Sequence, residues 1–309
     1  MNHYSIYGSC LATAMHFPEL RPAGPVTPKW TFETTPQLAP MDAVTELGAE
    51  LIYADVHARL YRHADGHRIA VDDTGEFDLS ADGRHLRWQE RRDAWPDFVR
   101  AHLMGRVLAT SLFLDGGLPL HGSAVAFGSG VVAFLAPKGY GKSSTALALT
   151  AVGARLVTDD TLPVDPAAVP MAWPGVHSMR VRVDSMDAQG LANRGFETHE
   201  GKRVLADIPE DHLQHAPAPL RAIYLLNPFT RNPGDAPAVR TQMAESMAAL
   251  WLVSHVKIAR MLGASAAPAL LDRAAHVVRA VPVYRLDAAR ELALLPTIAE
   301  TIASWHSAA

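Results

Sequence analysis

A short glycine-containing run offers the clearest chemistry in this sequence. Residues 136–143, APKGYGKS, match the phosphate-binding pattern G-x-x-x-x-G-K-[ST] except at the first position, where alanine replaces glycine. In such loops, backbone N–H groups surround phosphates at the positive end of the following helix. Lys142 would reach the β- and γ-phosphates, and the Ser143 hydroxyl would bind magnesium. The predicted nucleotide-binding residues are Pro137, Lys138, Gly139, Tyr140, Gly141, Lys142, Ser143 and Ser144.

Two adjacent carboxylates follow the loop at a distance that suggests a second part of the same site. Asp159 and Asp160 end the segment Arg155–Thr158, which has the apolar character of a short strand. If the intervening helix crosses over to a strand next to the loop strand, both acids emerge at the sheet end where phosphates bind. Neighbouring residues on a strand point to opposite sides, so we expect different roles. One would hold magnesium and the other would accept a proton from an attacking hydroxyl.

Phosphoryl transfer also needs cations that offset the charge of the transferred group. Four candidates lie in segments interrupted by Gly and Pro, where loops can approach a site: Arg180, Arg182, Lys202 and Arg203. Arg180 and Arg203 are the preferred pair.

The elements that must position these residues alternate between strand and helix. Residues 131–136 form an apolar strand that runs into the loop, and residues 143–152 are rich in the helix formers Ala and Leu. Ala136 suits the first loop position if its φ stays negative, since glycine is needed there only for a sharp turn. Further predicted elements are a hairpin that pairs residues 123–127 with 131–136, a strand at 222–226, helices at 241–261 and 267–278, a strand at 281–286 and a helix from Leu295.

The N-terminal region has a different pattern. From Leu51 to Trp88, short alternating runs are separated by Asp-Gly and Asp-Thr-Gly turns, which predicts an antiparallel meander. Apolar residues then recur at helical spacing from Val99 to Leu112, ahead of Gly116-Gly117. We therefore predict a small antiparallel β-rich region at 1–95 and a catalytic α/β domain at 96–309.

Composition limits the classes of partner. The chain has 309 residues, a formal net charge of -4 and one cysteine, Cys10. An acidic balance gives no general reason to bind nucleic acid or an anionic membrane, and a single cysteine makes no internal disulfide. The longest apolar runs are far shorter than the roughly 20 residues that span a bilayer. A soluble cytoplasmic protein is expected, and a homo-oligomer is compatible with the sequence.

Three segments together resemble the catalytic core of the HPr serine kinase superfamily: LHGSAVAF (120–127), APKGYGKSS (136–144) and GARLVTDD (153–160). The resemblance implies an HPr kinase/PEP carboxykinase-like P-loop fold with a mixed sheet and flanking helices. It implies ATP and Mg²⁺ as cofactors, with Lys142 and Ser143 on phosphate and metal. His121 would orient or tune the catalytic acid. Asp160 is preferred as the base and Asp159 as its neighbour on the metal side, although the reverse order stays open.

Two departures indicate a subgroup of that superfamily. The chain has no counterpart of the glutamate-containing EIRGLG segment of the carbohydrate-regulatory enzymes, and it opens with YSIYG and a strand meander. Both features resemble the HPr-kinase-like proteins of peptide-maturation clusters, including lasso-peptide kinases that phosphorylate a C-terminal serine. The implied activity is transfer of the γ-phosphoryl group to a serine of a ribosomally made precursor peptide. Two alternatives remain: a kinase of a small hydroxylated metabolite, and a nucleotide-binding accessory protein without phosphoryl transfer.

Overall fold

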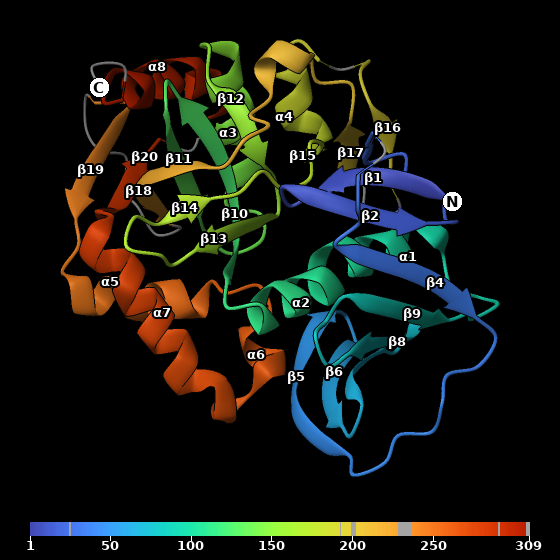
Figure 1. Cartoon of the computed structure of the whole chain (residues 1–309). Coiled ribbons are helices and arrows are strands. Elements are labelled where there is room, and N and C mark those ends of the chain that lie inside the picture. The colour runs from blue at the N-terminus through green and yellow to red at the C-terminus, as the bar shows by residue number, and fades with distance from the viewer. Residues whose placement is uncertain (25, 192, 199–201, 228–235, 290, 307–309) are drawn as a thin grey trace.

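The first part of the chain forms a nine-stranded sheet, at the right and bottom of Figure 1. The computed structural model describes residues 1–24, 26–191, 193–198, 202–227, 236–289 and 291–306. The strand order is β3-β1-β2-β4-β9-β8-β7-β6-β5. The strands are β1 (Asn2–Ile6), β2 (Ser9–Thr13), β3 (Arg21–Pro22), β4 (Trp30–Thr35), β5 (Thr45–Tyr53), β6 (Val56–His63), β7 (Gly66–Val71), β8 (Gly75–Ser80) and β9 (His85–Gln89).

The predicted meander is confirmed, because β5 to β9 pair antiparallel in chain order. Gly75 and Gly83, in the predicted turns, have φ values of 100° and 68°. The region as a whole is not purely antiparallel, which corrects our prediction: β4 pairs parallel with both β2 and β9. The connections before and after β4 are long, so each carries the chain back to the same end of the sheet.

A helical segment follows, as the apolar spacing predicts, but it has three parts. They are α1 (Pro96–His102), a π-helical turn η1 (Leu103–Val107) and α2 (Leu108–Leu114). Val99, Leu103 and Val107 are fully buried on its apolar side. The π-helical turn was not predicted, and such turns often occur at functional sites.

A mixed sheet forms the centre of the molecule. Its strands run in the order β12-β10-β11-β18-β20-β19, with β11 parallel to β18 and β18 parallel to β20. The N-terminal half of the long strand β10 also pairs with β13, which continues through β14 to β18. The strands are β10 (Leu118–Phe127), β11 (Gly130–Leu135), β12 (Arg155–Thr158), β13 (Thr161–Asp165), β14 (Met171–Ala172), β18 (Ala218–Leu226), β19 (Ala238–Gln242) and β20 (Val283–Ala288).

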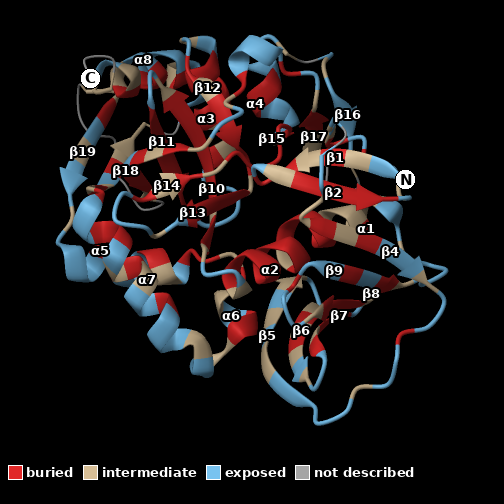
Figure 2. Cartoon of the chain, viewed as in Figure 1, coloured by how far each residue is buried: buried red, intermediate tan, exposed pale blue. Residues whose placement is uncertain are grey.

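Both faces of this sheet are buried, as Figure 2 shows in red. Val132 and Phe134 of β11 face a cluster formed with helices α3 (Lys142–Ala151) and α8 (Leu295–Ser304). Val131, Ala133 and Leu135 of the same strand face the opposite cluster. The alternation explains why β11 is a continuous apolar run in the sequence, as expected for a strand with two buried faces.

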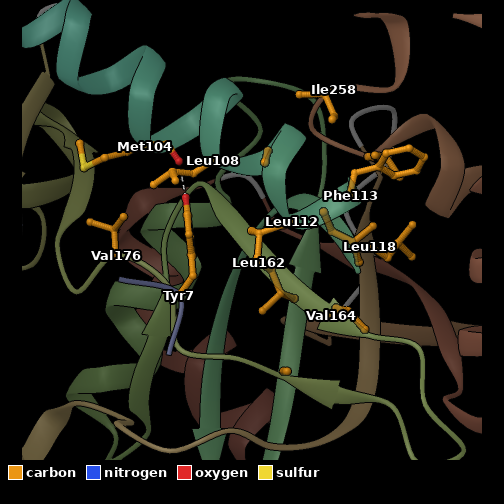
Figure 3. Packing of buried hydrophobic residues seen from close by; sticks show 14 of the residues in the cluster. Tyr7, Met104, Leu108, Leu112, Phe113, Leu118, Leu162, Val164, Val176 and Ile258 are labelled. Atoms are coloured by element: carbon orange, nitrogen blue, oxygen red, sulfur yellow. Dashed lines mark hydrogen bonds between the residues drawn. The ribbon is translucent and has the colours of Figure 1, made fainter. Parts of the chain in front are cut away.

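The second cluster joins the central sheet to the N-terminal sheet. In Figure 3, Tyr7 of the β1–β2 turn packs with Met104 and Leu108 of the helical segment, and Ile258 belongs to the same cluster. The Tyr7 hydroxyl donates a hydrogen bond to the Met104 carbonyl. The predicted regions 1–95 and 96–309 therefore share one hydrophobic core.

The segment between β14 and β18, which the sequence left unassigned, contains a small sheet in the order β15-β17-β16. Its elements are β15 (Met179–Arg182), α4 (Val183–Asp187), β16 (Phe196–Glu197), β17 (Lys202–Leu205) and a 3-10 turn η2 (Glu210–His212). The C-terminal part adds α5 (Glu245–Ser254), α6 (Ala259–Leu262), η3 (Ala264–Ala266), α7 (Ala267–Ala280) and η4 (Leu292–Leu294). None of the helices in the described ranges is both long and apolar enough to cross a membrane.

The predicted continuous helix at 241–261 is wrong in two places. Residues 241–242 belong to β19, and the helix is broken between α5 and α6. At the break, the His121 backbone N–H donates to the His255 carbonyl (2.6 Å), and the Lys257 N–H donates to the Pro119 carbonyl (2.8 Å). The chain leaves the helix at this point because its backbone pairs with β10, a tertiary contact that helical periodicity does not encode.

Candidate active site

The glycine-containing loop connects β11 to α3, as predicted. Gly139 and Gly141 have φ values of 87° and 88°, and Gly141 caps the start of α3. A Cβ added at either glycine would meet no atom within 4 Å, so the backbone faces open space. Ala136 is buried and does not adopt a positive φ, which is the condition under which alanine was expected to fit.

The loop forms one wall of a cavity of about 1510 Å³. All eight predicted nucleotide-binding residues line it, together with His121, Asp159 and Asp160. Glu50 and Tyr53 of the N-terminal sheet also line it. Ser144 lines the cavity while its hydroxyl donates to Ser185 Oγ (2.9 Å).

Lys142 lies at the start of α3 with its ammonium group turned toward β10. Its Nζ donates to the Ala136 carbonyl (2.7 Å), the Pro137 carbonyl (3.2 Å) and His121 Nε2 (3.1 Å). Burial lowers the pKa of Lys142 to about 8, although the carboxylates of Asp160 and Asp159 act in the opposite direction. The ammonium thus holds a proton at neutral pH less firmly than a lysine in water does.

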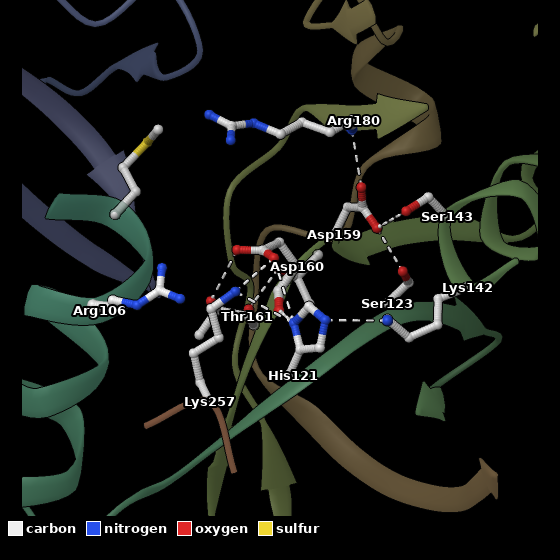
Figure 4. A network of polar contacts seen from close by, with 12 residues as sticks. Arg106, His121, Ser123, Lys142, Ser143, Asp159, Asp160, Thr161, Arg180 and Lys257 are labelled. Atoms are coloured by element: carbon white, nitrogen blue, oxygen red, sulfur yellow. Dashed lines mark hydrogen bonds and ion pairs between the residues drawn. The ribbon is translucent and has the colours of Figure 1, made fainter. Parts of the chain in front are cut away.

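His121, on β10, lies between Lys142 and Asp160 (Figure 4). The Asp160 carbonyl only accepts hydrogen bonds and lies closer to Nδ1 (3.0 Å) than the Lys257 ammonium does (3.3 Å), so Nδ1 carries the proton and Nε2 accepts from Lys142. Nδ1 lies 3.0 Å from the Asp160 carbonyl and 3.4 Å from Asp160 Oδ1. Burial, reinforced by the Lys257 charge, lowers the pKa of His121 to about 4. The imidazole is therefore neutral at physiological pH.

Asp159 is buried and faces the loop. Its Oδ1 accepts hydrogen bonds from Ser123 Oγ and from Ser143 Oγ (2.8 Å), and its Oδ2 accepts from the Arg180 backbone N–H (2.9 Å). Burial raises the pKa of Asp159, and the three hydrogen bonds partly offset that effect. This carboxylate and the Ser143 hydroxyl form the oxygen pair predicted for a metal ion.

Asp160 points away from Asp159 and has a different environment. Its Oδ1 lies 2.7 Å from Lys257 Nζ, and its side chain is 45% exposed. Burial alone would raise the pKa of Asp160, but the charge of Lys257 and the contact with His121 outweigh it and hold the pKa well below its usual value. The backbone φ of Asp160 is 85°, a conformation that is rare outside glycine and is found preferentially at functional sites. Asp159 and Asp160 therefore lie in different environments, as expected from their adjacent positions.

The sequence predicted that the strand ending at Asp159 and Asp160 lies next to the strand that leads into the loop, and the structure differs on this point. Strand β12, which ends before Asp159, is not adjacent to β11, because β10 lies between them. Both β11 and β12 run antiparallel to β10, so they share one direction and end at the same edge of the sheet. The acids and the loop therefore meet although their strands are not neighbours.

Lys257 was missed by sequence reasoning, which placed its segment in the predicted helix at 241–261. Its side chain is 11% exposed, and Nζ lies 2.7 Å from Asp160 Oδ1 and 3.3 Å from His121 Nδ1. Burial lowers the pKa of Lys257, and Asp160 acts against that effect. The available signal was a lysine flanked by the apolar residues Val256 and Ile258, because lysine is rarely buried without a partner.

The four cationic candidates divide between two strands. Arg180, Arg182 and Lys202 line the cavity, whereas Arg203 does not, although it belongs to the described residues. Arg203 Nη2 lies 3.3 Å from Glu197 Oε1 on the neighbouring strand. Successive residues of β17 point to opposite sides, so only one of positions 202 and 203 can face the cavity. The structure places Lys202 there, in contrast to the preferred pair of Arg180 and Arg203.

Comparisons with known proteins add little to this geometry. No protein-family model matches the chain, and a search of curated proteins finds no match. Among solved structures, the chain is similar to the Hpr(Ser) kinase/phosphatase from Coxiella burnetii, with 13% sequence identity and a TM-score of 0.34 over 61% of this chain and 95% of that chain. A likeness at this level is too low to assign a fold or an activity.

Proposed function

We propose that the protein is a kinase that uses ATP and magnesium to transfer the γ-phosphoryl group to a hydroxyl. The observation that carries the proposal is the arrangement of two carboxylates at one loop. Asp159 contacts the loop hydroxyl of Ser143, while Asp160 contacts the His121 that Lys142 also contacts. A nucleotide-binding loop alone needs no second acid, whereas phosphoryl transfer uses one acid for metal and one for the attacking hydroxyl.

The residues present fit ATP with magnesium. The open backbone at Gly139 and Gly141 and the start of α3 suit phosphate oxygens. Ser143 and Asp159 offer the oxygen ligands that magnesium prefers, and phosphates and water would complete its shell. The described residues contain no cluster of three His, Cys, Asp or Glu side chains that could hold a metal ion, so the ion depends on the nucleotide. Magnesium bound there would neutralise charge on the β- and γ-phosphates.

The remaining residues have distinct tasks in this proposal. Asp160, ionised because of its depressed pKa, accepts the proton of the attacking hydroxyl. His121 stays neutral and holds Asp160 in place through its Nδ1–H. Lys142 leaves the loop carbonyls to bind phosphate, and Arg180 adds positive charge to the cavity wall.

The acceptor in this proposal is a serine of a ribosomally made precursor peptide, with a C-terminal serine as the first choice. The sequence resemblance to lasso-peptide kinases supports it, and so does a cavity that extends past Asp160 to the N-terminal sheet. A small hydroxylated metabolite is the alternative acceptor.

Mass spectrometry tests the proposal directly. Purified protein is incubated with ATP, magnesium and candidate precursor peptides, and the addition of one phosphate to a serine is expected. Asp160→Asn should abolish the product while ATP still binds. If ATP binds but no hydroxylated peptide or metabolite gains phosphate, the kinase proposal fails and a nucleotide-binding accessory role replaces it.

A further inference from the structure

The two carboxylate oxygens of Asp160 have unequal surroundings. Oδ1 lies 2.7 Å from Lys257 Nζ and 3.4 Å from His121 Nδ1. Oδ2 has one hydrogen bond among the described residues, a long one of 3.5 Å from Thr161 Oγ1. The protein therefore occupies one oxygen of the proposed base and leaves the other largely available.

Oδ2 faces a residue without a side chain. A Cβ added to Gly105, in the middle of the π-helical turn η1, would lie 3.8 Å from Asp160 Oδ2 and 3.6 Å from Lys257 Cε. Gly105 does not adopt a positive φ, so no backbone requirement explains glycine at this position. Glycine inside a helix is unfavourable relative to alanine, and glycine often marks the close approach of another group. Both Gly105 and the neighbouring Arg106 line the cavity.

Lys257 lies between α5 and α6, and its position is fixed by tertiary contacts. The break between α5 and α6 pairs with β10 through the His255 carbonyl and the Lys257 N–H, so the lysine and His121 are held on adjacent backbones. Figure 4 shows the Lys257 ammonium beside Asp160 and His121, with the Arg106 guanidinium on the same side. This rigid placement holds one carboxylate oxygen in a single direction.

We propose that Lys257 is a positioning residue which holds Oδ1 of Asp160, so that Oδ2 receives the acceptor hydroxyl in the space beside Gly105. The inference rests on the proposed kinase function and adds to it the location of the acceptor. The acceptor O–H bond breaks and its proton passes to Oδ2. The new oxygen–phosphorus bond forms as the bond from the γ-phosphorus to the bridging oxygen breaks, and that electron pair remains on ADP.

The first experiment measures Asp160 in the nucleotide-free protein, so it does not depend on any activity. The carboxyl carbon is followed by NMR against pH in aspartate-labelled protein, with Asp160→Asn for assignment. Lys257→Met should raise the pKa of Asp160, and Lys257→Arg should keep it low. Lys29→Met is the matched control, because it removes another Lys–Asp pair at 2.7 Å, between Lys29 and Asp115. An unchanged Asp160 titration in Lys257→Met would overturn the role of Lys257.

The same measurement tests the space beside Gly105. Gly105→Val should cover Oδ2 and raise the pKa of Asp160, whereas Gly105→Ala should change it little, because its Cβ sits at an ordinary contact distance. Folding is checked by the melting temperature, which Gly105→Ala should leave unchanged or raise. Equal ATP turnover in wild type and in folded Gly105→Val would place the acceptor elsewhere. The other titratable and charged groups around the Asp160–Lys257 pair, which must be unchanged in all variants, are His121, Lys142, Asp159, Arg180, Arg106, Glu50 and Tyr7.

ATP turnover separates this inference from the proposed function. With water as the only acceptor, Gly105→Val should lower turnover by about a hundredfold while the Kd for ATP stays the same. Lys257→Met should lower kcat, shift the acidic limb of the pH profile upward and leave the Kd unchanged. If the wild type binds ATP but transfers phosphate neither to water nor to any hydroxylated peptide or metabolite, the kinase proposal fails, and the NMR titrations still test the contact between Lys257 and Asp160. If turnover occurs and is identical in all variants, only the present inference fails.

Discussion

The ammonium of Lys142 lies 3.1 Å from Nε2 of His121, so the loop lysine and the β10 histidine are directly linked. His121 contacts Asp160 through its other nitrogen. In the proposed function, one neutral imidazole therefore connects the phosphate site at the loop with the base Asp160. A phosphate that draws Lys142 away would remove the hydrogen bond at Nε2 of His121 and leave its contact with Asp160.

Removing the loop lysine should weaken ATP binding. Lys142→Ala loses a charged hydrogen-bond donor to phosphate, which corresponds to about a 10- to 100-fold increase in the Kd for ATP. Isothermal titration calorimetry measures the Kd for ATP. The control is Lys29→Ala, which removes an ion pair with Asp115 far from the loop in the sequence and should leave the Kd unchanged. Equal affinities in wild type and Lys142→Ala would exclude the loop as the phosphate site.

Removing the proposed base should affect turnover and not binding. Asp160→Asn keeps the shape of the side chain but cannot accept the proton, so kcat should fall by about 10²- to 10⁴-fold. The Kd for ATP, measured in parallel, should change little. A wild-type kcat in Asp160→Asn would show that Asp160 is not the base, so that either Asp159 is the base or the reaction uses none.

ATP affinity should depend on pH through Lys142. Its pKa in the free protein is about 8, and phosphate binds the protonated form. The affinity should therefore be constant below about pH 8 and fall by about tenfold per pH unit above it, because binding then requires uptake of a proton. Lys142→Arg, which stays charged, should remove the dependence. A Kd that is flat from neutral pH well into the alkaline range in the wild type would contradict the assigned pKa.

The magnesium requirement should depend on Asp159. Asp159→Asn removes the negative charge beside Ser143, so the magnesium concentration needed for half-maximal ATP turnover should rise by about 10- to 100-fold. Asp165→Asn, at an exposed position on β13, serves as the control. An unchanged magnesium requirement in Asp159→Asn would assign the metal to another group.

Two adjacent residues of β17 should behave differently. Lys202 lines the cavity, so Lys202→Ala should lower kcat/KM for ATP by about tenfold, the effect of one charged hydrogen bond. Arg203 faces Glu197, so Arg203→Ala should leave kcat/KM close to the wild-type value. The opposite result would restore the sequence-based preference for Arg203.

Much of the local structure could be predicted because local rules govern it. The alternation of apolar residues and the Asp-Gly turns gave the meander from β5 to β9, and the strand–loop–helix around Gly139 and Gly141 followed from residue types and order. The parallel pairings of β4 and the break after α5 could not be predicted in this way. Both depend on backbone hydrogen bonds between segments that are far apart in the sequence.

The sequence by itself determined which residues are the candidates for chemistry at the loop: Lys142 and Ser143, with Asp159 and Asp160 a short distance further on. Their spacing along one strand, one loop and one helix brings them to a common edge of the sheet. Only the tertiary structure decided what surrounds Asp160. Lys257 is 97 residues away from it in the sequence, and the pairing of its segment with β10 delivers a buried ammonium to the carboxylate. Gly105, which precedes Asp160 in the sequence, lies near the other carboxylate oxygen on the π-helical turn η1. The environment of the proposed base is therefore set by packing between distant segments.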